Sequence, residues 1–261
     1  MKIGVFDSGV GGLIILRAIR KRLSAYDYLY LGDTARVPYG NRTQAQIYQF
    51  TKRGVEYLFK NNCALIIVAC NSASSRALRR LQREWLPKHY PDRRILGVII
   101  PTAEAAIAQK NIKKIGVLAT KATTASKSFA KEIKKLTKNI IVAHQSAPLL
   151  VPLIEEGKFK ESKLVLEKYL QPLLSKNIKT IILGCTHYPL IKKLLPKNIK
   201  VISQDEVVPE KLAFYLRKHT ELEKRLSKKK SCVISVTRTT PQVKKLTVQW
   251  FGKSTLKKVS I

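Results

Sequence analysis

The chain has 261 residues, of which 45% are hydrophobic, so it can bury an apolar core in one large or two small domains and is not a disordered chain. The net charge is +33 and is spread evenly along the chain. Residues 1–96 carry 17 basic and 6 acidic groups, residues 97–206 carry 19 basic and 8 acidic groups, and residues 207–261 carry 14 basic and 3 acidic groups, so each segment has a net charge of +11. A tail dedicated to nucleic acid would concentrate the charge more strongly. The excess indicates either a general adaptation of solubility or a weak, salt-sensitive attraction to nucleic acid or anionic membranes, and it favours encounter with anionic substrates.

The four cysteines, Cys63, Cys70, Cys185 and Cys232, form no CxxC pair, which argues against zinc ribbons and thioredoxin-type motifs. They are too few for a disulfide scaffold. Asp7 and several glycines interrupt what would be the apolar region of a signal peptide, and the longest apolar stretches are far shorter than a membrane span. We therefore expect a cytoplasmic protein with reduced thiols and no membrane insertion.

Short β-branched runs alternate with longer helical patterns, which is typical of a parallel sheet in an α/β fold. The runs predict strands at Lys2–Asp7, Tyr28–Gly32, Ala64–Ala69, Ile95–Ile99, Lys114–Ala119, Asn139–Ala143, Thr180–Leu183, Lys200–Ser203 and Cys232–Val236. The helical patterns predict helices at Gly12–Leu23, Arg42–Lys60, Ser72–Glu84, Lys127–Leu136, Lys160–Leu174 and Pro209–Lys218.

A weak internal similarity relates two parts of the chain. KIGVFDS at residues 2–8 resembles KIGVLAT at 114–120, and each part later contains an apolar strand that ends in a cysteine. Cys70 lies 63 residues beyond Asp7, and Cys185 lies 66 residues beyond Ala119. Ligands of open α/β sheets bind at the carboxyl ends of the strands. Two facing lobes would therefore place one cysteine on each wall of a cleft, although chance similarity between strands remains an alternative.

Cys70 and Cys185 both lie at strand-to-helix junctions. Small polar residues follow Cys70, and Thr186, His187, Tyr188 and Pro189 follow Cys185, so a helix begins just after each. Unpaired N–H groups and the positive end of a helix dipole favour a thiolate and bind carboxylates. Cysteine is also a small buried apolar residue, and we prefer that interpretation for Cys63 and Cys232 only.

Two further motifs follow strands. Residues 6–12 (FDSGVGG) form a glycine-rich loop, but neither GxGxxG nor GxxxxGK[ST] is present, and Asp7 would repel a phosphate. Asp7 could instead orient an ammonium group or tune a thiol, or cap the next helix. Residues 32–40 (GDTARVPYG) predict an ordered loop. His187 could be a general acid, a supporting residue or a structural histidine. A metal site formed by Cys185 and His187 would lack a convincing third ligand.

FDSGVGG, GDTARVPYG, ACNSAS at 69–74 and GCTHYP at 184–189 together resemble glutamate racemase, a cofactor-independent amino-acid racemase. The resemblance covers nearly the whole chain and is loosest over Cys232–Gly252. It implies two similar α/β lobes with mainly parallel sheets and the active site between them. Residues 1–96 and 207–261 would form one lobe, completed by the C-terminal segment, and residues 97–206 the other.

The resemblance also implies residue roles. Cys70 and Cys185 match the two catalytic acid/bases, with Cys70 deprotonating the D enantiomer and Cys185 the L enantiomer. Asp7 and His187 match residues that support them, and Asp33 and Glu155 match carboxylates around the site. Substrate contacts fall on Asp7, Ser8, Pro38, Tyr39, Gly40, Asn71, Ser72, Thr120, Thr123, Thr186 and His187. Ser72 departs from the threonine usual in the family but keeps the hydroxyl, and Ala119 stands where glycine is common.

Inversion of a stereocentre by proton transfer requires removal on one face and delivery on the other. Two thiols on opposite walls can do this, one starting as thiolate and the other as thiol, and their roles exchange in the reverse direction. A free cysteine is only a few per cent thiolate near pH 7, so its surroundings must tune it. Negative charge that develops on the substrate carboxylate needs preorganised donors, such as the backbone N–H groups after each cysteine.

We therefore expect interconversion of L- and D-glutamate for peptidoglycan, with no cofactor and no metal, and we expect a homodimer. Racemisation of aspartate or a related acid is the alternative enzyme. The GCTH sequence favours glutamate, because aspartate racemases tend to carry an acid after that Cys-Thr pair. A basic binding protein that acts on gyrase or nucleic acid is the alternative outside enzymes.

Overall fold

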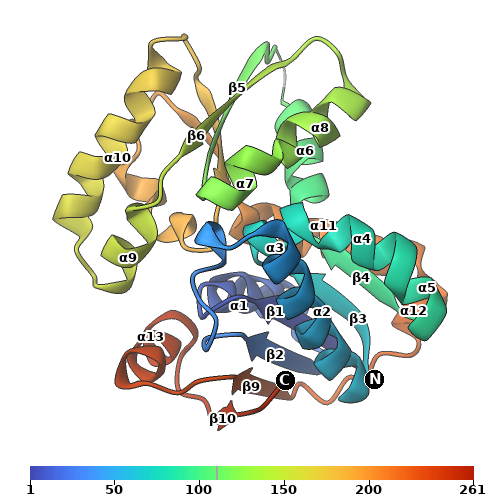
Figure 1. Ribbon diagram of the computed structural model, residues 1–261. Coiled ribbons are helices and arrows are strands. Elements are labelled where there is room, and N and C mark those ends of the chain that lie inside the picture. Colours follow the sequence, from blue (N-terminus) through green and yellow to red (C-terminus); the bar gives the residue numbers. More distant parts are fainter. Residues whose placement is uncertain (110) are drawn as a thin grey trace.

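The computed structural model describes residues 1–109 and 111–261, whose strands form two parallel sheets (Figure 1). The strand pairings within each sheet are parallel, and helices separate consecutive strands along most of the chain. The predicted α/β fold with two mainly parallel sheets is therefore confirmed.

The larger sheet has six strands in the order β10-β9-β2-β1-β3-β4. All six residues of β3 are buried, as expected for a strand in a parallel sheet that is covered on both faces. The last two strands of the chain pair with strands from its beginning, so both termini lie in this part of the molecule. The bounds are β1 Lys2–Asp7, β2 Tyr28–Gly32, β3 Cys63–Val68, β4 Arg94–Gly97, β9 Cys232–Val236 and β10 Leu256–Lys258.

Three helices, α1, α11 and α13, pack together against one face of this sheet, and α2 covers the other. The apolar face of α1 carries Leu13, Ile15, Leu16 and Ile19, all fully buried. Thr43 begins α2 with a reciprocal capping box to Gln46, which satisfies backbone groups at the helix start. The bounds are α1 Gly12–Arg22, α2 Gln44–Lys60, α11 Gln204–Lys218, α12 Thr220–Glu223 and α13 Pro241–Phe251.

A broken helical segment follows β3, where we predicted one continuous helix at Ser72–Glu84. That prediction is wrong about continuity. At Ala77 the backbone φ is −118°, which interrupts the helix after one and a half turns, and no glycine or proline in the sequence signals the break. The segment comprises α3 Asn71–Arg76, α4 Leu78–Arg80, a π-helical turn at Leu81–Trp85 and α5 Leu86–His89.

The smaller sheet has four strands in the order β6-β5-β7-β8. Helices α6 and α8 cover one of its faces through a core around Ile115, Val117 and Phe129, and α10 covers the other around Leu166 and Leu170. The bounds are β5 Lys114–Ala119, β6 Ile141–Ser146, β7 Thr180–Gly184, β8 Lys200–Ile202, α6 Ile99–Ile107, α7 Lys121–Ser126, α8 Ser128–Leu136, α9 Leu150–Glu155 and α10 Phe159–Leu174.

The chain passes between the two sheets twice. It leaves the larger sheet after β4 and enters α6, and it returns from β8 into α11. The expected strand Ile95–Ile99 is wrong at its end, because β4 stops at Gly97 and Ile99 already begins α6. The domain boundaries at 96/97 and 206/207 stay a prediction; the second of them falls within the first turn of α11.

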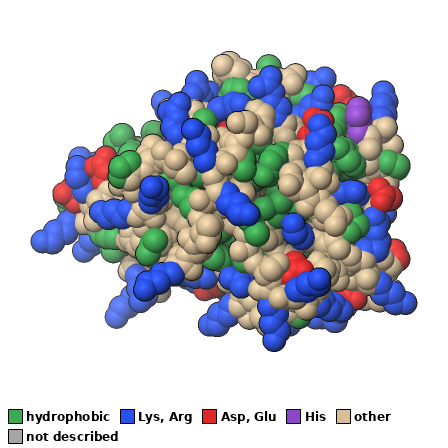
Figure 2. Space-filling model, turned by 90° about the horizontal axis from the view of Figure 1, so that it is seen from below, with side chains coloured by type: hydrophobic (Ala, Val, Ile, Leu, Met, Phe, Trp, Pro, Cys, Tyr) green, Lys and Arg blue, Asp and Glu red, His purple; other side chains and the backbone are tan. Residues whose placement is uncertain are grey.

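Basic side chains are scattered over the surface. In the face shown in Figure 2, lysine and arginine occur on all sides, with acidic groups between them. Several are paired, for example Arg22 with Glu210 and Arg225 with Asp92. Over residues 1–109 and 111–261, no helix combines the length and apolar character that a membrane crossing requires.

Candidate active site

Cys70 lies two residues after β3 and caps the helix α3. Its backbone is extended, and its sulfur accepts a hydrogen bond from the N–H of Ala73 at 3.5 Å. The sulfur also lies 3.3 Å from Oγ of Ser8, which comes from the glycine-rich loop after β1. The expected position at a helix start is therefore confirmed, and two loops at neighbouring strand ends meet at this thiol.

Burial dominates the electrostatics of Cys70, which is 6% exposed. It raises the pKa of the thiol to about 12, and the charges of Asp7 and Cys185 add to the rise. The hydrogen bonds that Cys70 makes with Ser8 and Ala73 oppose the shift but do not cancel it. The N–H of Ala73 at the helix start favours a thiolate, as we expected, but it is not the dominant effect. Desolvation outweighs the N–H groups, so Cys70 is a thiol at neutral pH.

Cys185 follows β7 and belongs to a relay of three side chains. Its sulfur lies 3.7 Å from Nδ1 of His187, and Nε2 of His187 lies 2.9 Å from Oε1 of Glu155. Glu155 is the last residue of α9, and the 3-10 helix Tyr188–Leu194 begins after His187 with Pro189 in its first turn. The fold thus brings His187 and Glu155, two predicted site residues that are 32 positions apart, together beside Cys185.

His187 is buried, which by itself lowers its pKa. Its hydrogen bonds to Cys185 and Glu155, together with the negative charge of those groups, outweigh burial and raise the pKa to about 10. The imidazole is therefore charged at neutral pH. A charged imidazole beside the Cys185 sulfur can hold a proton there and release it to a reacting group.

Asp7 ends β1 and is 1% exposed. Its Oδ2 accepts the N–H of Gly9 at 3.0 Å, whereas Oδ1 is buried with no partner among the residues that the structure describes. Burial raises the pKa of this carboxyl, while the N–H groups of Gly9 and Gly12 and the charge of His187 act in the opposite direction. A buried carboxylate oxygen without a partner suits a cationic ligand, such as an ammonium group.

Hydroxyl groups from segments that follow strands of both sheets meet near Cys70. Oγ of Ser72 lies 3.0 Å from Oγ1 of Thr120, and Thr120 donates to Oγ1 of Thr123 at 3.1 Å. Thr120 caps α7 at the end of β5, in the position that the internal similarity indicated. A Cβ on Gly40 would lie 3.1 Å from Cβ of Thr120, so this loop also reaches across.

Gly11 packs directly against the residues that follow Cys185. A Cβ on this residue would lie 2.5 Å from Oγ1 of Thr186 and from Cε1 of His187. Gly11 has ordinary helical dihedral angles, so glycine is required by space and not by backbone conformation. The glycine-rich loop therefore admits the Cys185 motif.

Asp33 directly follows β2, the neighbour of β1 in the larger sheet. It is fully buried, and its oxygens accept hydrogen bonds from Arg36, Thr237 and Tyr39 at 2.7–2.8 Å. Both of its oxygens are therefore occupied by protein donors. In this arrangement Asp33 holds the loop of Pro38 and Tyr39, whose ring packs in the same core cluster as Cys70.

The side chain of Asn71 is engaged within the protein. Its amide exchanges two hydrogen bonds of 2.8 Å with the amide of Gln204, so the side chain is occupied within the protein. Only its backbone N–H, directly after Cys70, is left to face a ligand. A substrate contact by Asn71 therefore runs through the main chain.

These groups, contributed by segments that follow strands of both sheets, can accept and donate protons. Cys185 is close enough to Cys70 for its charge to act on it. In the part of the chain that the structure describes, no group of three or more His, Cys, Asp and Glu residues is arranged to hold a metal ion. Two thiols, one imidazole and a cluster of hydroxyl donors suit proton transfer on a small anionic substrate.

A family model for Asp/Glu/Hydantoin racemases matches residues 3–208, which is more than half of the chain. The chain belongs to the Asp/Glu/hydantoin racemase family. A protein named glutamate racemase from Sulfurihydrogenibium sp. (strain YO3AOP1) is 42% identical over 218 residues, covering 81% of this chain and 82% of the relative. One from Persephonella marina is 40% identical over 84% of this chain and 82% of the relative.

Solved structures of this family share the whole fold. A glutamate racemase from Bacillus anthracis is 30% identical, with a TM-score of 0.89 over 100% of this chain and 97% of that one. The enzyme from Francisella tularensis, solved in complex with D-glutamate, is 31% identical, with a TM-score of 0.88 over 99% and 97%. An aspartate racemase from Picrophilus torridus, 20% identical with a TM-score of 0.55 over 85% and 99%, shares the fold.

Several residues at this racemase-family site were not found from the sequence. Gln204 pairs with Asn71, and Thr237 and Arg36 bind Asp33. Trp250 of α13 stands edge-on to His187 with 5.3 Å between ring centroids, and Gln242 donates to the backbone O of Glu155. All but Arg36 lie in the last quarter of the chain, outside the motifs, and no local pattern marks them.

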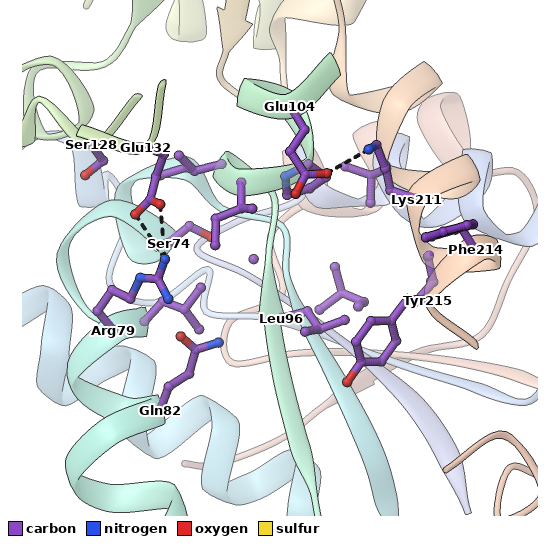
Figure 3. A pocket seen from close by; sticks show the side chains of 18 of the residues that line it. Ser74, Arg79, Gln82, Leu96, Glu104, Ser128, Glu132, Lys211, Phe214 and Tyr215 are labelled. Atoms are coloured by element: carbon purple, nitrogen blue, oxygen red, sulfur yellow. Dashed lines mark hydrogen bonds and ion pairs between the residues drawn. The ribbon is translucent and has the colours of Figure 1, made fainter. Parts of the chain in front are cut away.

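A separate cavity of about 320 Å³ lies away from the cysteines (Figure 3). Helices α3, α4, α6, α8 and α11 line it, with an apolar floor that includes Leu96 and Leu212. Two ion pairs stand at its sides, Arg79 with Glu132 at 3.1 Å and Lys211 with Glu104 at 2.7 Å. The cavity adjoins both passages of the chain between the sheets.

Proposed function

We propose that this chain interconverts L- and D-glutamate by cofactor-independent proton transfer at Cα, and so supplies D-glutamate for peptidoglycan. The observation that carries the proposal is the meeting of Cys70 and the Cys185–His187–Glu155 relay at the carboxyl ends of two facing parallel sheets. Relatives named glutamate racemase, 37–42% identical over most of the chain, support glutamate as the substrate.

Cys70 and Cys185 are the two acid/bases in this proposal. Cys185 takes the α-proton of L-glutamate while Cys70 delivers a proton to the opposite face, and the roles exchange for D-glutamate. Asp7 supports Cys70 and accepts the substrate ammonium at its unpaired Oδ1. His187, held by Glu155, supplies positive charge and a proton beside Cys185.

The remaining predicted residues bind the substrate in this proposal. Backbone N–H groups after the two cysteines and the hydroxyls between the sheets meet the charge that develops on the carboxylate. Asp33 acts through the Tyr39 loop and not on the substrate. The contacts are made by Ser8, Pro38, Tyr39, Gly40, Asn71, Ser72, Thr120, Thr123 and Thr186.

The raised pKa of Cys70 sets the starting state. With Cys70 a thiol and a charged His187 beside Cys185, the enzyme without substrate is prepared for L-glutamate. Binding of D-glutamate requires that Cys70 first lose its proton. The substrate ammonium beside Asp7 favours that loss, because it offsets the carboxylate charge that raises the pKa of the thiol.

The decisive test follows the circular dichroism of L-glutamate with purified protein and no added cofactor. The signal decays to zero with the wild type, and Cys70→Ser and Cys185→Ser slow the decay by about 10²–10⁴-fold, as expected for loss of a general acid or base. Cys232→Ser is the matched control and stays active, since Cys232 is half-buried at the start of β9, at the end of the sheet opposite to Cys70. A wild type that leaves the signal unchanged contradicts the proposal.

Solvent deuterium separates two bases from one. In D₂O, early turnover places deuterium at Cα of the product enantiomer, while the remaining substrate keeps its proton. Proton NMR after chiral separation measures both. Deuterium that enters both enantiomers equally from the start contradicts the two-thiol arrangement.

Parallel assays with aspartate address the alternative substrate within the family, and we propose that glutamate is strongly preferred. We also propose a cytoplasmic homodimer, to be checked by sedimentation.

The net charge of +33 supports a weak attraction to nucleic acid as a side property. An electrophoretic shift that disappears at modest salt identifies it as nonspecific.

A further inference from the structure

The side chains of Asn71 and Gln204 form a closed pair. Nδ2 of Asn71 donates to Oε1 of Gln204, and Nε2 of Gln204 donates to Oδ1 of Asn71, both at 2.8 Å. The two residues are 2% and 0% exposed and 133 positions apart in the chain. Two hydrogen bonds in opposite directions fix both planar amides, because rotation of either one breaks both bonds.

The two residues occupy matching positions in the fold. Asn71 is the first residue of α3, directly after Cys70. Gln204 is the first residue of α11, two positions after β8 ends and where the chain returns from the smaller sheet. Helix α11 packs against α1 of the larger sheet and against α6. The pair therefore joins the turn of Cys70 to one of the two passages between the sheets.

The cavity in Figure 3 makes this connection more important. Ser74 of α3 and Val208 and Leu212 of α11 line this cavity, which therefore lies between parts of the two helices one turn beyond the amide pair. On that side the cavity interrupts the side-chain packing between α3 and α11. The paired amides are thus a fixed link at the helix starts, next to a loosely filled region.

We propose that Gln204 is a positioning residue for Cys70, which it holds in place through Asn71, coupling this thiol to the passage between the sheets. The inference rests on the proposed racemase function. When the pair is intact, the backbone N–H of Asn71 and the sulfur of Cys70 keep a fixed orientation toward Cα of the substrate. Loss of the pair leaves a buried amide without its partner and frees this turn to shift.

The first experiment compares Gln204→Leu, nearly equal in size, with the wild type in glutamate racemisation. Because misplacement of a reacting group by about 1 Å can cost 10²-fold, kcat/KM falls by at least about tenfold. Gln82→Leu is the matched control, since it also removes an amide that is hydrogen-bonded within the protein, in this case to the backbone O of Ile95, away from the Cys70 turn. Thermal melting of both variants separates misplacement from unfolding.

Isotope effects supply a readout that a purely structural role does not move. Cys70 removes the proton of D-glutamate, whereas Cys185 removes that of L-glutamate. In Gln204→Leu the primary deuterium effect measured with 2-deuterated D-glutamate therefore rises above the wild-type value, while the effect with the 2-deuterated L enantiomer stays within error. A rise that is equal in both directions contradicts positioning of Cys70 in particular.

A double-mutant cycle then tests the route through Asn71. Asn71→Ala combined with Gln204→Leu is no slower than Asn71→Ala alone, since both remove the same link. Gln204→Glu keeps the acceptor for Asn71 and recovers part of the activity. If the wild type racemises glutamate but Gln204→Leu is equally fast, or the two losses simply multiply, this inference fails while the proposed function stands. A wild type that does not racemise glutamate overturns both.

Discussion

The Glu155 carboxylate lies 2.9 Å from Nε2 of His187, on the side of the imidazole opposite to the Cys185 sulfur. This places a negative charge behind a charged imidazole, as in other relays in which a carboxylate orients a histidine. Glu155 is the only carboxylate among the described residues within ion-pair distance of His187. The charge state beside Cys185 therefore depends on a residue at the end of a separate helix.

Glu155→Gln tests this dependence. The amide keeps the hydrogen bond but removes the negative charge that helps to raise the pKa of His187, so the imidazole loses its proton at lower pH. We expect kcat to fall by about tenfold near pH 8, less than the 10²–10⁴-fold of a lost general acid or base. The activity lost is recovered as the pH is lowered. An unchanged pH–rate profile shows that Glu155 does not act through His187.

Stability at high pH reports on His187 itself. Its pKa in the folded protein is about 10, above the unfolded value of 6.5, so folding favours the charged form. This stabilisation is complete below pH 6.5 and is lost as the pH rises through 10, with a slope of at most about 1.4 kcal/mol per pH unit. Urea unfolding of the wild type and His187→Asn between pH 6 and 10.5 measures it. The difference in slope disappears if His187 is neutral when folded.

Gly11→Ala tests the contact between the two halves of the site. The added methyl would lie 2.5 Å from Thr186 and His187, which must move away, whereas the helical backbone at position 11 accepts alanine. We expect kcat/KM for glutamate to fall roughly tenfold or more, with the free energy of unfolding nearly unchanged. Gly9→Ala is the control, because its methyl would lie 3.3 Å from the exposed Val37 and 4.0 Å from Oδ2 of Asp7, with no closer contact. Equal losses in both variants contradict the steric explanation.

Asp33→Asn separates a structural from a chemical role. The carboxylate accepts hydrogen bonds from Arg36, Tyr39 and Thr237, and removing its charge leaves the buried side of Arg36 uncompensated. Breaking a buried pair in this way costs about 3 kcal/mol. Asp92→Asn, which breaks the exposed pair with Arg225, costs about 1 kcal/mol or less. A variant of Asp33 that is as stable as the wild type but inactive would place this residue on the substrate.

The strands that carry the site were predictable because each ends in a chemically distinctive residue. β-branched runs predicted β1, β3, β5 and β7, and Asp7, Cys70, Thr120 and Cys185 stand at or just beyond their carboxyl ends. The edges of the fold were harder to predict. Ile99 extends an apolar run that suits a strand equally well, and β10 has only three residues. Strand β6 runs from Ile141 to Ser146, two residues later than expected at its start.

The supporting residues could not be predicted, for a different reason. Gln204, Thr237 and Trp250 act through contacts with Asn71, Asp33 and His187 that cross 63 to 204 positions of sequence. Such contacts depend on how two sheets and a returning C-terminal segment pack, and local periodicity carries no information about that. The raised pKa of Cys70 could not be predicted either, because the sequence indicates the helix start but not how deeply the thiol is buried.

The two passages between the sheets, before α6 and before α11, also restrict how the molecule can open. A body attached at one point can swivel and twist, whereas a body attached at two neighbouring points turns mainly about the line that joins them. The smaller sheet is attached in the second way. The sulfurs of Cys70 and Cys185 can therefore separate and return by one hinge rotation. In the mechanism that we propose, each closure then presents the same two faces of Cα to the same two thiols, which is the condition for inversion in both directions.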